Sequence, residues 1–189
     1  MSEYKLETSA LLDGYSREFN GVALRELDDL AIVSLAIPLG AEKQAGQRLE
    51  KAYGVPFPAV GKTTVTKDAK TRFLCLGQDQ LFAIFTHPSA DAQQAITGQL
   101  GQGFYTTDQT DVWVALELSG ENAVRALERI CPIDLHQTAF LNGDAARTSM
   151  EHLGTIIVRI ETERFILLSA SSSAGSFLHA VETSIINTL

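Results

Sequence analysis

The apolar positions of residues 30–100 change their spacing in a fixed order along the chain. The apolar run from Leu30 to Ile37 is stopped by Pro38, which predicts a strand buried on both faces. Ala45, Leu49 and Ala52 recur at helical spacing, and Gly54 follows as a stop signal. The pattern therefore predicts, in order, a strand at 30–37, a helix at 41–53, a loop at 54–70, strands at 71–76 and 80–85 joined by a tight turn, and a helix capped by Ser89 that ends near residue 101.

Residues 111–189 show the same order of spacings. Apolar and other residues alternate from 111 to 118, which predicts a half-buried strand. Ser119 can cap the helix that follows, and Pro132 ends it. The remaining pattern predicts a loop at 132–154, strands at 155–160 and 164–169 joined by a turn, and a last helix capped by Ser173.

The two halves keep nearly the same register, because Leu30 aligns with Val112, Leu81 with Phe165 and Ser89 with Ser173. We interpret them as two pseudo-repeats of an α+β unit, each strand-helix-strand-strand-helix, with helices packed on mixed or antiparallel sheets. One unit alone would leave a sheet face or edge uncovered, so we expect residues 1–189 to form a single domain. Residues 1–29 have weak periodicity, and we expect a lead-in segment that packs on the body or on a partner.

The loops at 54–70 and 132–154 fall at equivalent places in the two halves and exceed ordinary connection lengths. Loops of this kind commonly carry function, so residues 56–62 and 134–148 are our candidates for contact with a partner. Within the second segment the predicted contact residues are Asp134, Phe140, Arg147 and Thr148. For Arg147 two interpretations stay open: an ion pair with Asp144 or another nearby acid, or a bidentate contact to a partner's carboxylate or backbone.

Composition narrows the class of partner and the compartment. The 189 residues are 45% hydrophobic and carry a net charge of −8, which argues against nucleic acid as a partner. No apolar stretch approaches the length that spans a bilayer, and no export signal is visible at the first residues. Cys75 and Cys131 lie in apolar patterns, so we expect reduced core thiols and a cytoplasmic protein.

The sequence offers little catalytic chemistry. His87, His136, His152 and His179 have no metal-ligand spacing, and no metal site is predicted. Asp134, His136 and Ser149 could be drawn as a hydrolase triad, but no Gly-x-Ser-x-Gly elbow presents a serine. The glycines at 98, 101 and 103 follow a helix where phosphate loops precede one, and the segment Gly61-Lys62-Thr63-Thr64 lacks the earlier glycine of a P-loop. We predict no catalytic residue in this chain.

The second half carries a family resemblance in three stretches. Residues 116–123 read Leu-Glu-Leu-Ser-Gly-Glu-Asn-Ala, and residues 131–135 read Cys-Pro-Ile-Asp-Leu. Phe140, Gly143 and the run Ala146-Arg147-Thr148 follow, before the strand pair that ends with Arg-Phe-Ile-Leu-Leu at 164–168. This series resembles the gamma subunit of heterotetrameric sarcosine oxidase, which is itself similar to the folate-binding aminomethyltransferases of the glycine cleavage system, the T-proteins. The likeness is best over 110–189 and weaker over 30–100.

The resemblance implies a subunit without chemistry of its own. The holoenzyme of that family demethylates sarcosine oxidatively, and its FAD, FMN, NAD and tetrahydrofolate belong to other subunits. The gamma subunit packs mainly on the T-protein-like region of the alpha subunit, with beta and delta in the same complex. We therefore expect this chain to bind no cofactor itself and to have the alpha subunit as its main partner.

Two departures from the T-protein pattern bear on activity. T-proteins carry a catalytic aspartate just before the strand equivalent to 156–159, whereas residues 150–154 here read Met-Glu-His-Leu-Gly. An arginine is also expected before the last helix, where Ser171-Ser172-Ser173 stands. The leading hypothesis is a non-catalytic subunit of an oxidase; the alternatives are a stand-alone folate-binding, aminomethyltransferase-like protein and a structural module of another complex.

Overall fold

Two antiparallel sheets form the body of the protein, and the computed structural model describes residues 9–87 and 91–188. The five-stranded sheet has the order β4 (Lys62–Val65), β5 (Thr71–Gly77), β6 (Gln80–Thr86), β3 (Leu30–Ala36), β7 (Tyr105–Asp108). The six-stranded sheet has the order β1 (Ser16–Phe19), β2 (Val22–Glu26), β8 (Trp113–Ser119), β11 (Arg164–Ala170), β10 (Leu153–Glu161), β9 (Ala145–Met150). The α+β fold class predicted from the sequence is confirmed.

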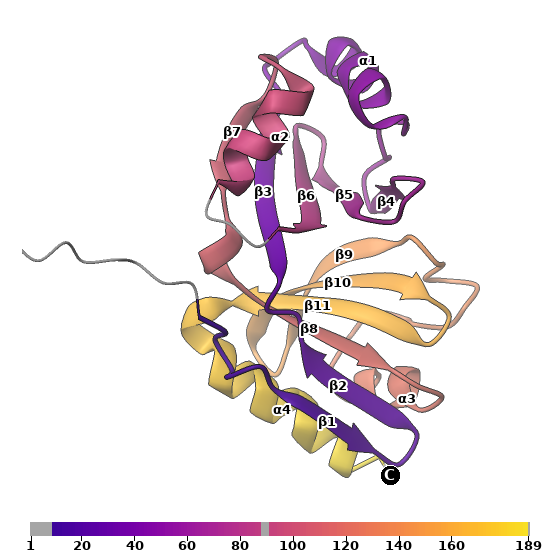
Figure 1. The fold of residues 1–189 in the computed structure, drawn as a ribbon. Coiled ribbons are helices and arrows are strands. Elements are labelled where there is room, and N and C mark those ends of the chain that lie inside the picture. Colours follow the sequence, from indigo (N-terminus) through magenta and orange to yellow (C-terminus); the bar gives the residue numbers. More distant parts are fainter. Residues whose placement is uncertain (1–8, 88–90, 189) are drawn as a thin grey trace, which may run out of the picture.

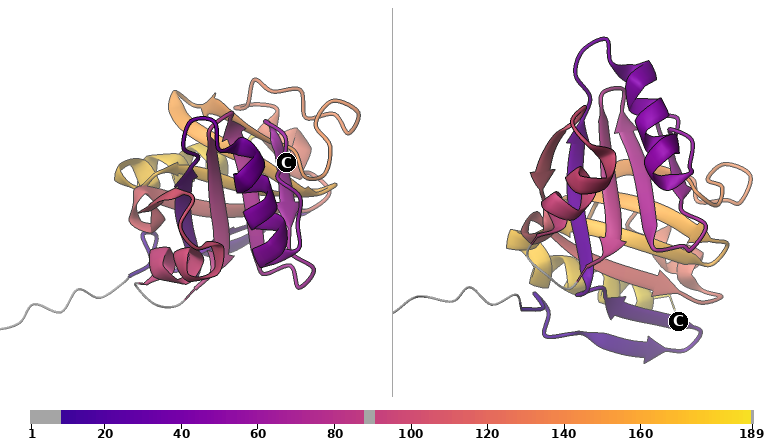
Figure 2. Two further views of the ribbon diagram at one scale, coloured as in Figure 1. Left: turned by 90° about the horizontal axis from the view of Figure 1, so that it is seen from above. Right: turned by 45° about the horizontal axis from the view of Figure 1, so that its top comes forward.

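Helices cover the outer face of each sheet, so the layers run helix, sheet, sheet, helix. Figures 1 and 2 show α1 (Glu42–Tyr53) and α2 (Ala92–Leu100) beside the five-stranded sheet. On the far side of the molecule, α3 (Ala123–Leu127) and α4 (Ala174–Ile186) lie against the six-stranded sheet. Two 3-10 turns, residues 110–112 and 171–173, lead into β8 and α4.

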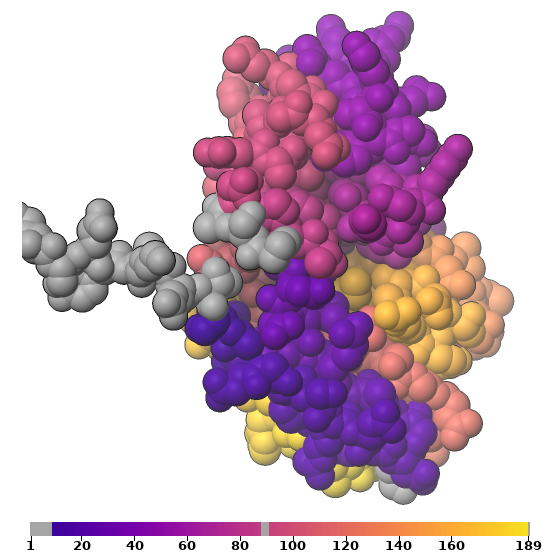
Figure 3. Space-filling model, in the orientation of Figure 1, coloured from indigo at the N-terminus to yellow at the C-terminus, as the bar shows by residue number. Residues whose placement is uncertain are grey.

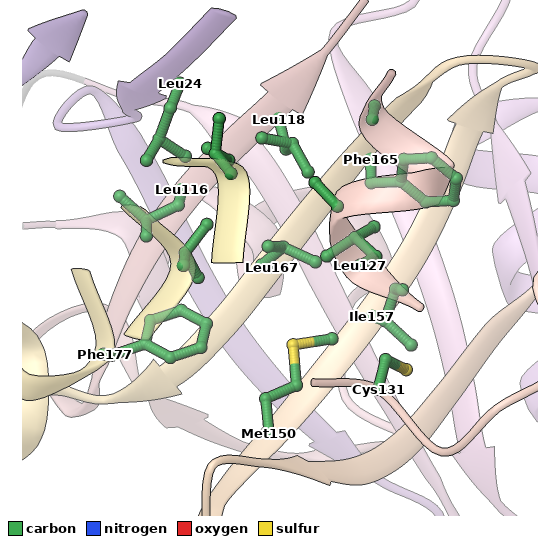
Figure 4. Packing of buried hydrophobic residues seen from close by; sticks show 14 of the residues in the cluster. Leu24, Leu116, Leu118, Leu127, Cys131, Met150, Ile157, Phe165, Leu167 and Phe177 are labelled. Atoms are coloured by element: carbon green, nitrogen blue, oxygen red, sulfur yellow. The ribbon is translucent and has the colours of Figure 1, made fainter. Parts of the chain in front are cut away.

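Three apolar clusters fill the spaces between these layers. One joins α3 and α4 to the six-stranded sheet and includes Leu116, Phe165 and Phe177, which Figure 4 shows among the other side chains of the cluster. A second packs α1 and α2 on the five-stranded sheet. The third lies between the sheets, where Ile84 of β6 and Val158 of β10 belong to one cluster. Because successive strand residues point to opposite faces, each central strand supplies two clusters at once.

The halves of the chain use the same order of elements and the same strand order. β3-α1-β4-β5-β6-α2 is followed by β8-α3-β9-β10-β11-α4, and the sheet orders 4-5-6-3 and 9-10-11-8 correspond strand for strand. One further strand, β7, extends the first sheet beside β3, and two, β1 and β2, extend the second beside β8. The predicted strands and helices of both units are present, with ends that differ by a few residues.

The sequence missed five strands and misjudged one burial pattern. β4 and β9 lie inside segments predicted as loops, β7 was not anticipated, and β1 and β2 occupy the predicted lead-in. These strands are short or polar, so no apolar alternation marks them. β8 is buried on both faces rather than half-buried, because Ala115 and Glu117 face the five-stranded sheet and retain 6% and 7% exposure. This correction follows from a sheet that is covered on both sides.

The predicted helices are present, but the residues predicted to cap them, where the structure describes them, do not act as predicted. The residue at the N-cap of α3 is Asn122 and not Ser119. Ser173 occupies the N-cap position of α4 but makes no capping hydrogen bond there. The cap predicted at Ser89 lies outside the described residues. None of the helices in the described ranges combines the length and the apolar character that crossing a bilayer requires.

Candidate partner-contact site

The two segments predicted as long loops meet at one side of the molecule. The Lys62 ammonium lies 2.6 Å from the Asp144 carboxylate. The Thr63 amide donates to the Gly143 carbonyl at 2.7 Å, and the Ala145 amide donates to the Gly61 carbonyl at 2.9 Å. This contact, which we call the loop junction (residues 61–63 and 143–145), ties edge strand β4 of one sheet to edge strand β9 of the other.

Asp144 is the most constrained side chain of the junction. Its second carboxylate oxygen accepts the Leu141 amide at 3.0 Å, and the residue is 6% exposed. A buried carboxylate is costly unless it is paired and hydrogen-bonded, and both conditions are met here. Of the interpretations left open for Arg147, the ion pair with Asp144 is not formed, because Asp144 pairs with Lys62.

A buried arginine supports the segment that leads into the junction. Arg159 of β10 is 1% exposed, and its guanidinium donates to the carbonyls of Phe140 at 2.5 Å and of Leu135 at 2.8 Å. The same guanidinium lies over the Phe165 ring, 4.8 Å from its centroid. Burial lowers the pKa of Arg159, which the charges of Glu163 and Asp144 partly oppose. The 131–144 segment is thus fastened to the outer face of the six-stranded sheet by charge-assisted hydrogen bonds.

The predicted contact residues do not form one patch. Asp134 is exposed, and its carboxylate accepts the His136 amide at 2.9 Å in a local turn. Phe140 is only 5% exposed and packs in the cluster under α3 and α4. Because its side chain is enclosed by its own chain, we remove Phe140 from the proposed contact set. Sequence spacing alone could not tell an anchoring aromatic residue from a docking one.

Arg147 and Thr148 lie on β9 rather than in a loop, so their side chains point to opposite faces of the strand. Arg147 is exposed, and its guanidinium lies 5.6 Å from the centroid of the Phe82 ring on the other sheet. Thr148 is half-buried on the Cys131 side. Burial raises the pKa of Cys131, against the effect of hydrogen bonds from Ile133 and Thr148. Among the ion pairs of the described residues, none includes Arg147.

The residues that could carry chemistry are not gathered into an enclosed site. The His136 ring contacts the Thr138 hydroxyl at 2.9 Å, so the drawn triad of Asp134, His136 and Ser149 is not assembled. Glu151 sits with His152 in the turn between β9 and β10, where both have positive φ. It borders an open hollow of about 350 Å³. Over residues 9–87 and 91–188, no cluster of three or more His, Cys, Asp or Glu could hold a metal ion.

Sequence reasoning overlooked two charged residues that organise the sheets. One is Arg159; the other is Glu117 of β8, whose carboxylate lies 2.9 Å from Arg25 and 2.7 Å from Arg164. Burial by itself would raise the pKa of Glu117, but the hydrogen bonds and charges of the two arginines outweigh it and lower the pKa. A charged residue within an otherwise apolar strand was a usable signal for both.

Comparison with known proteins gave relatives but no family model that matches the chain. Sarcosine oxidase subunit gamma from Arthrobacter sp. is 28% identical over 148 residues, which are 78% of this chain and 71% of that protein. A chain of heterotetrameric sarcosine oxidase from Corynebacterium sp. U-96, solved with pyrrole 2-carboxylate, has a TM-score of 0.75 at 25% identity and matches 88% of this chain and 85% of that one.

A second solved structure shares the fold at lower identity. The glycine cleavage system aminomethyltransferase T from Bartonella henselae has a TM-score of 0.63 at 14% identity. The match covers 92% of this chain and 46% of that protein. The resemblance to the sarcosine oxidase gamma subunit is confirmed, and the fold is one that aminomethyltransferase T also contains.

Proposed function

We propose that this chain is a non-catalytic, gamma-type subunit of a sarcosine oxidase complex. The observation that carries the proposal is the likeness to subunit gamma from Arthrobacter sp. over 78% of the chain, together with the TM-score of 0.75 to a chain of the heterotetrameric enzyme. As such a subunit, it supports oxidative demethylation of sarcosine and transfer of the one-carbon unit to tetrahydrofolate without supplying a reacting group. Its cofactors then lie on the other subunits, and the complex is cytoplasmic.

The chemistry of the described residues favours a supporting role. Where T-proteins are expected to carry an aspartate, this chain has an exposed hairpin turn with Glu151 as its acid. A catalytic carboxylate is normally held in a pocket that tunes its pKa, and Glu151 has no such enclosure. We also propose that the two halves arose by duplication, which the matching strand orders support.

The alpha subunit is the partner we propose for the loop junction and the exposed face of β9. Arg147 is the residue we would change first, because it is exposed and makes no ion pair with the described residues. Its internal contact with Phe82 is worth about 0.5–1 kcal/mol at a partly exposed site. An arginine at the centre of an interface commonly contributes more than that, about 2 kcal/mol or above.

Co-expression of the tagged chain with the alpha, beta and delta subunits of sarcosine oxidase tests the assignment. We expect the three partners to co-purify with the wild-type chain, and Arg147→Ala to reduce their recovery while lowering the melting temperature only slightly. The control is Arg125→Ala, an exposed arginine of α3, which should change neither quantity. A wild-type chain that elutes without the other subunits contradicts the proposal.

The alternative is a stand-alone folate-binding protein, and the fold shared with aminomethyltransferase T is the observation in its favour. It predicts that the isolated chain binds tetrahydrofolate with micromolar affinity. Titration calorimetry of the isolated chain separates the two functions, because the subunit hypothesis predicts only the heat of dilution. The chain matches 46% of the length of that aminomethyltransferase.

A further inference from the structure

A cleft of about 310 Å³ opens between the two sheets, on the side where β2, β5 and β11 come together. Its apolar lining comes from both sheets and includes Leu27, Ile84 and Ile166, which are at most 9% exposed. In Figure 3 the indigo, violet-magenta and yellow parts of the chain that supply this lining meet near the centre of the view. The volume is at the lower end of the range of small-molecule sites.

Four cations border this cleft in a chain whose net charge is −8. Two of them are neutralised internally, since Arg25 and Arg164 both pair with the buried carboxylate of Glu117. Arg164 also lies 3.2 Å from Glu161. The other two, Lys70 and Arg72, appear in no ion pair between described residues. The third carboxylate at the cleft, Asp29, is exposed to solvent and therefore screened.

Arg72 is the cation with the least compensation. It is half-buried at the start of β5, and its guanidinium donates a hydrogen bond to the Thr63 hydroxyl at 3.0 Å. Burial lowers the pKa of Arg72, and the positive charge of Arg164 lowers it further. A guanidinium carries five donors and is costly to bury without an acceptor anion. An oxyanion in the cleft would accept those donors and relieve the repulsion from Arg164.

We propose that this cleft binds a small organic carboxylate, with the carboxylate on Arg72 and Lys70 and the apolar body between the sheets. The cationic rim selects the carboxylate, because guanidinium and carboxylate groups form parallel hydrogen bonds. The apolar lining selects an anion with a hydrophobic body over a fully hydrated inorganic ion. The assignment concerns this chain alone and stands independently of its assembly with other subunits.

Benzoate is a suitable probe, with benzyl alcohol as the uncharged analogue of the same shape. Each is titrated into the full-length chain in a buffer of low ionic strength, because salt screens the partly exposed cations. Amide chemical shifts report both the dissociation constant and the residues affected. We expect saturable shifts with benzoate, centred on residues that line the cleft, and only weak, unsaturated shifts with benzyl alcohol.

Arg72→Gln is the decisive variant, because glutamine keeps a donor for Thr63 while removing the charge. We expect the benzoate dissociation constant to rise at least about tenfold, the effect of losing roughly 1.4 kcal/mol. The matched control, Arg125→Gln, changes the same residue types on the exposed face of α3 and should leave the constant unchanged. The proposal is overturned if benzoate and benzyl alcohol bind with the same affinity. It is also overturned if the benzoate dissociation constant is unchanged in Arg72→Gln, or if benzoate causes no saturable chemical-shift change.

Discussion

Removing the guanidinium of Arg159 should loosen the 131–144 segment and destabilise the whole domain. Arg159→Met keeps an unbranched apolar stem of similar width, so the change isolates the two hydrogen bonds to the Phe140 and Leu135 carbonyls. The carbonyls lose their donor in a region where the arginine is 1% exposed. Other variants at this position would add a cavity to the loss, since the stem packs beside Phe165.

The magnitude follows from two opposing contributions. Each hydrogen bond to a charged donor contributes about 1.5–3 kcal/mol, so losing both costs roughly 3–6 kcal/mol. The variant also avoids the desolvation of a buried cation, which offsets part of that loss. We therefore expect a net loss of about 2–4 kcal/mol in the free energy of unfolding, a large share of the roughly 5–15 kcal/mol of a typical domain. For a chain of this size that is a fall in melting temperature of about 4–16 °C.

Urea unfolding followed by circular dichroism measures the loss, and hydrogen exchange locates it. Amides of the 131–144 segment should exchange faster in Arg159→Met than in the wild type. Amides of β5 and β6, in the other sheet, should change their exchange rates only as far as the loss in the global free energy of unfolding requires. Arg125→Met, on the exposed face of α3, serves as the control and should change stability by less than about 0.5 kcal/mol. If Arg159→Met is no less stable than Arg125→Met and exchange in the segment is unchanged, Arg159 does not hold the segment.

Two further predictions concern the glycines and the pH dependence. Gly120→Ala should destabilise the protein by more than about 2 kcal/mol, because φ is +120° and an added Cβ would lie 2.3 Å from the Gly21 carbonyl oxygen. In Gly175→Ala, in α4, the added Cβ meets nothing within 4 Å, so this variant should be slightly more stable than the wild type. Thermal unfolding of the two variants tests both expectations. Glu117 has a lowered pKa in the folded state, so its stabilising effect is present above the pKa of the unfolded chain and is lost as pH falls through the folded value. The difference in the free energy of unfolding between the wild type and Glu117→Gln should accordingly be largest near neutral pH and become smaller in acid. Urea unfolding at each pH measures this difference. A difference that grows in acid would contradict a lowered pKa for Glu117 in the folded state.

The sequence predicts a strand where the strand's own apolar side chains mark it as buried, and misses a strand that has few such side chains. β3, β6 and β11 are continuous apolar runs, and their positions were predicted within a few residues because only a sheet covered on both faces needs such runs. β4 and β7 are short and rich in Thr and charged residues, and they exist because a neighbouring strand offers hydrogen-bonding groups. Pairing of that kind is a tertiary effect that local pattern does not record.

The candidate site illustrates the same limit. The sequence placed two long segments at equivalent positions, but it missed the strands β4 and β9 inside them, and it could not know that Lys62 rather than Arg147 would pair with Asp144. Nor could it separate Phe140, which faces its own core, from Arg147, which faces outward. The family resemblance was available from the short series around residues 131–148, and the likeness to sarcosine oxidase subunit gamma over 78% of the chain confirmed it.

Native mass spectrometry of the chain co-expressed with the alpha, beta and delta subunits tests the central claim most directly. The account predicts one dominant species whose mass contains this chain in fixed stoichiometry with the larger subunits, alongside an isolated chain that shows no turnover and no folate adduct. A chain recorded solely at its own mass in that mixture, or an isolated chain that carries bound folate and transfers a one-carbon unit, would contradict it.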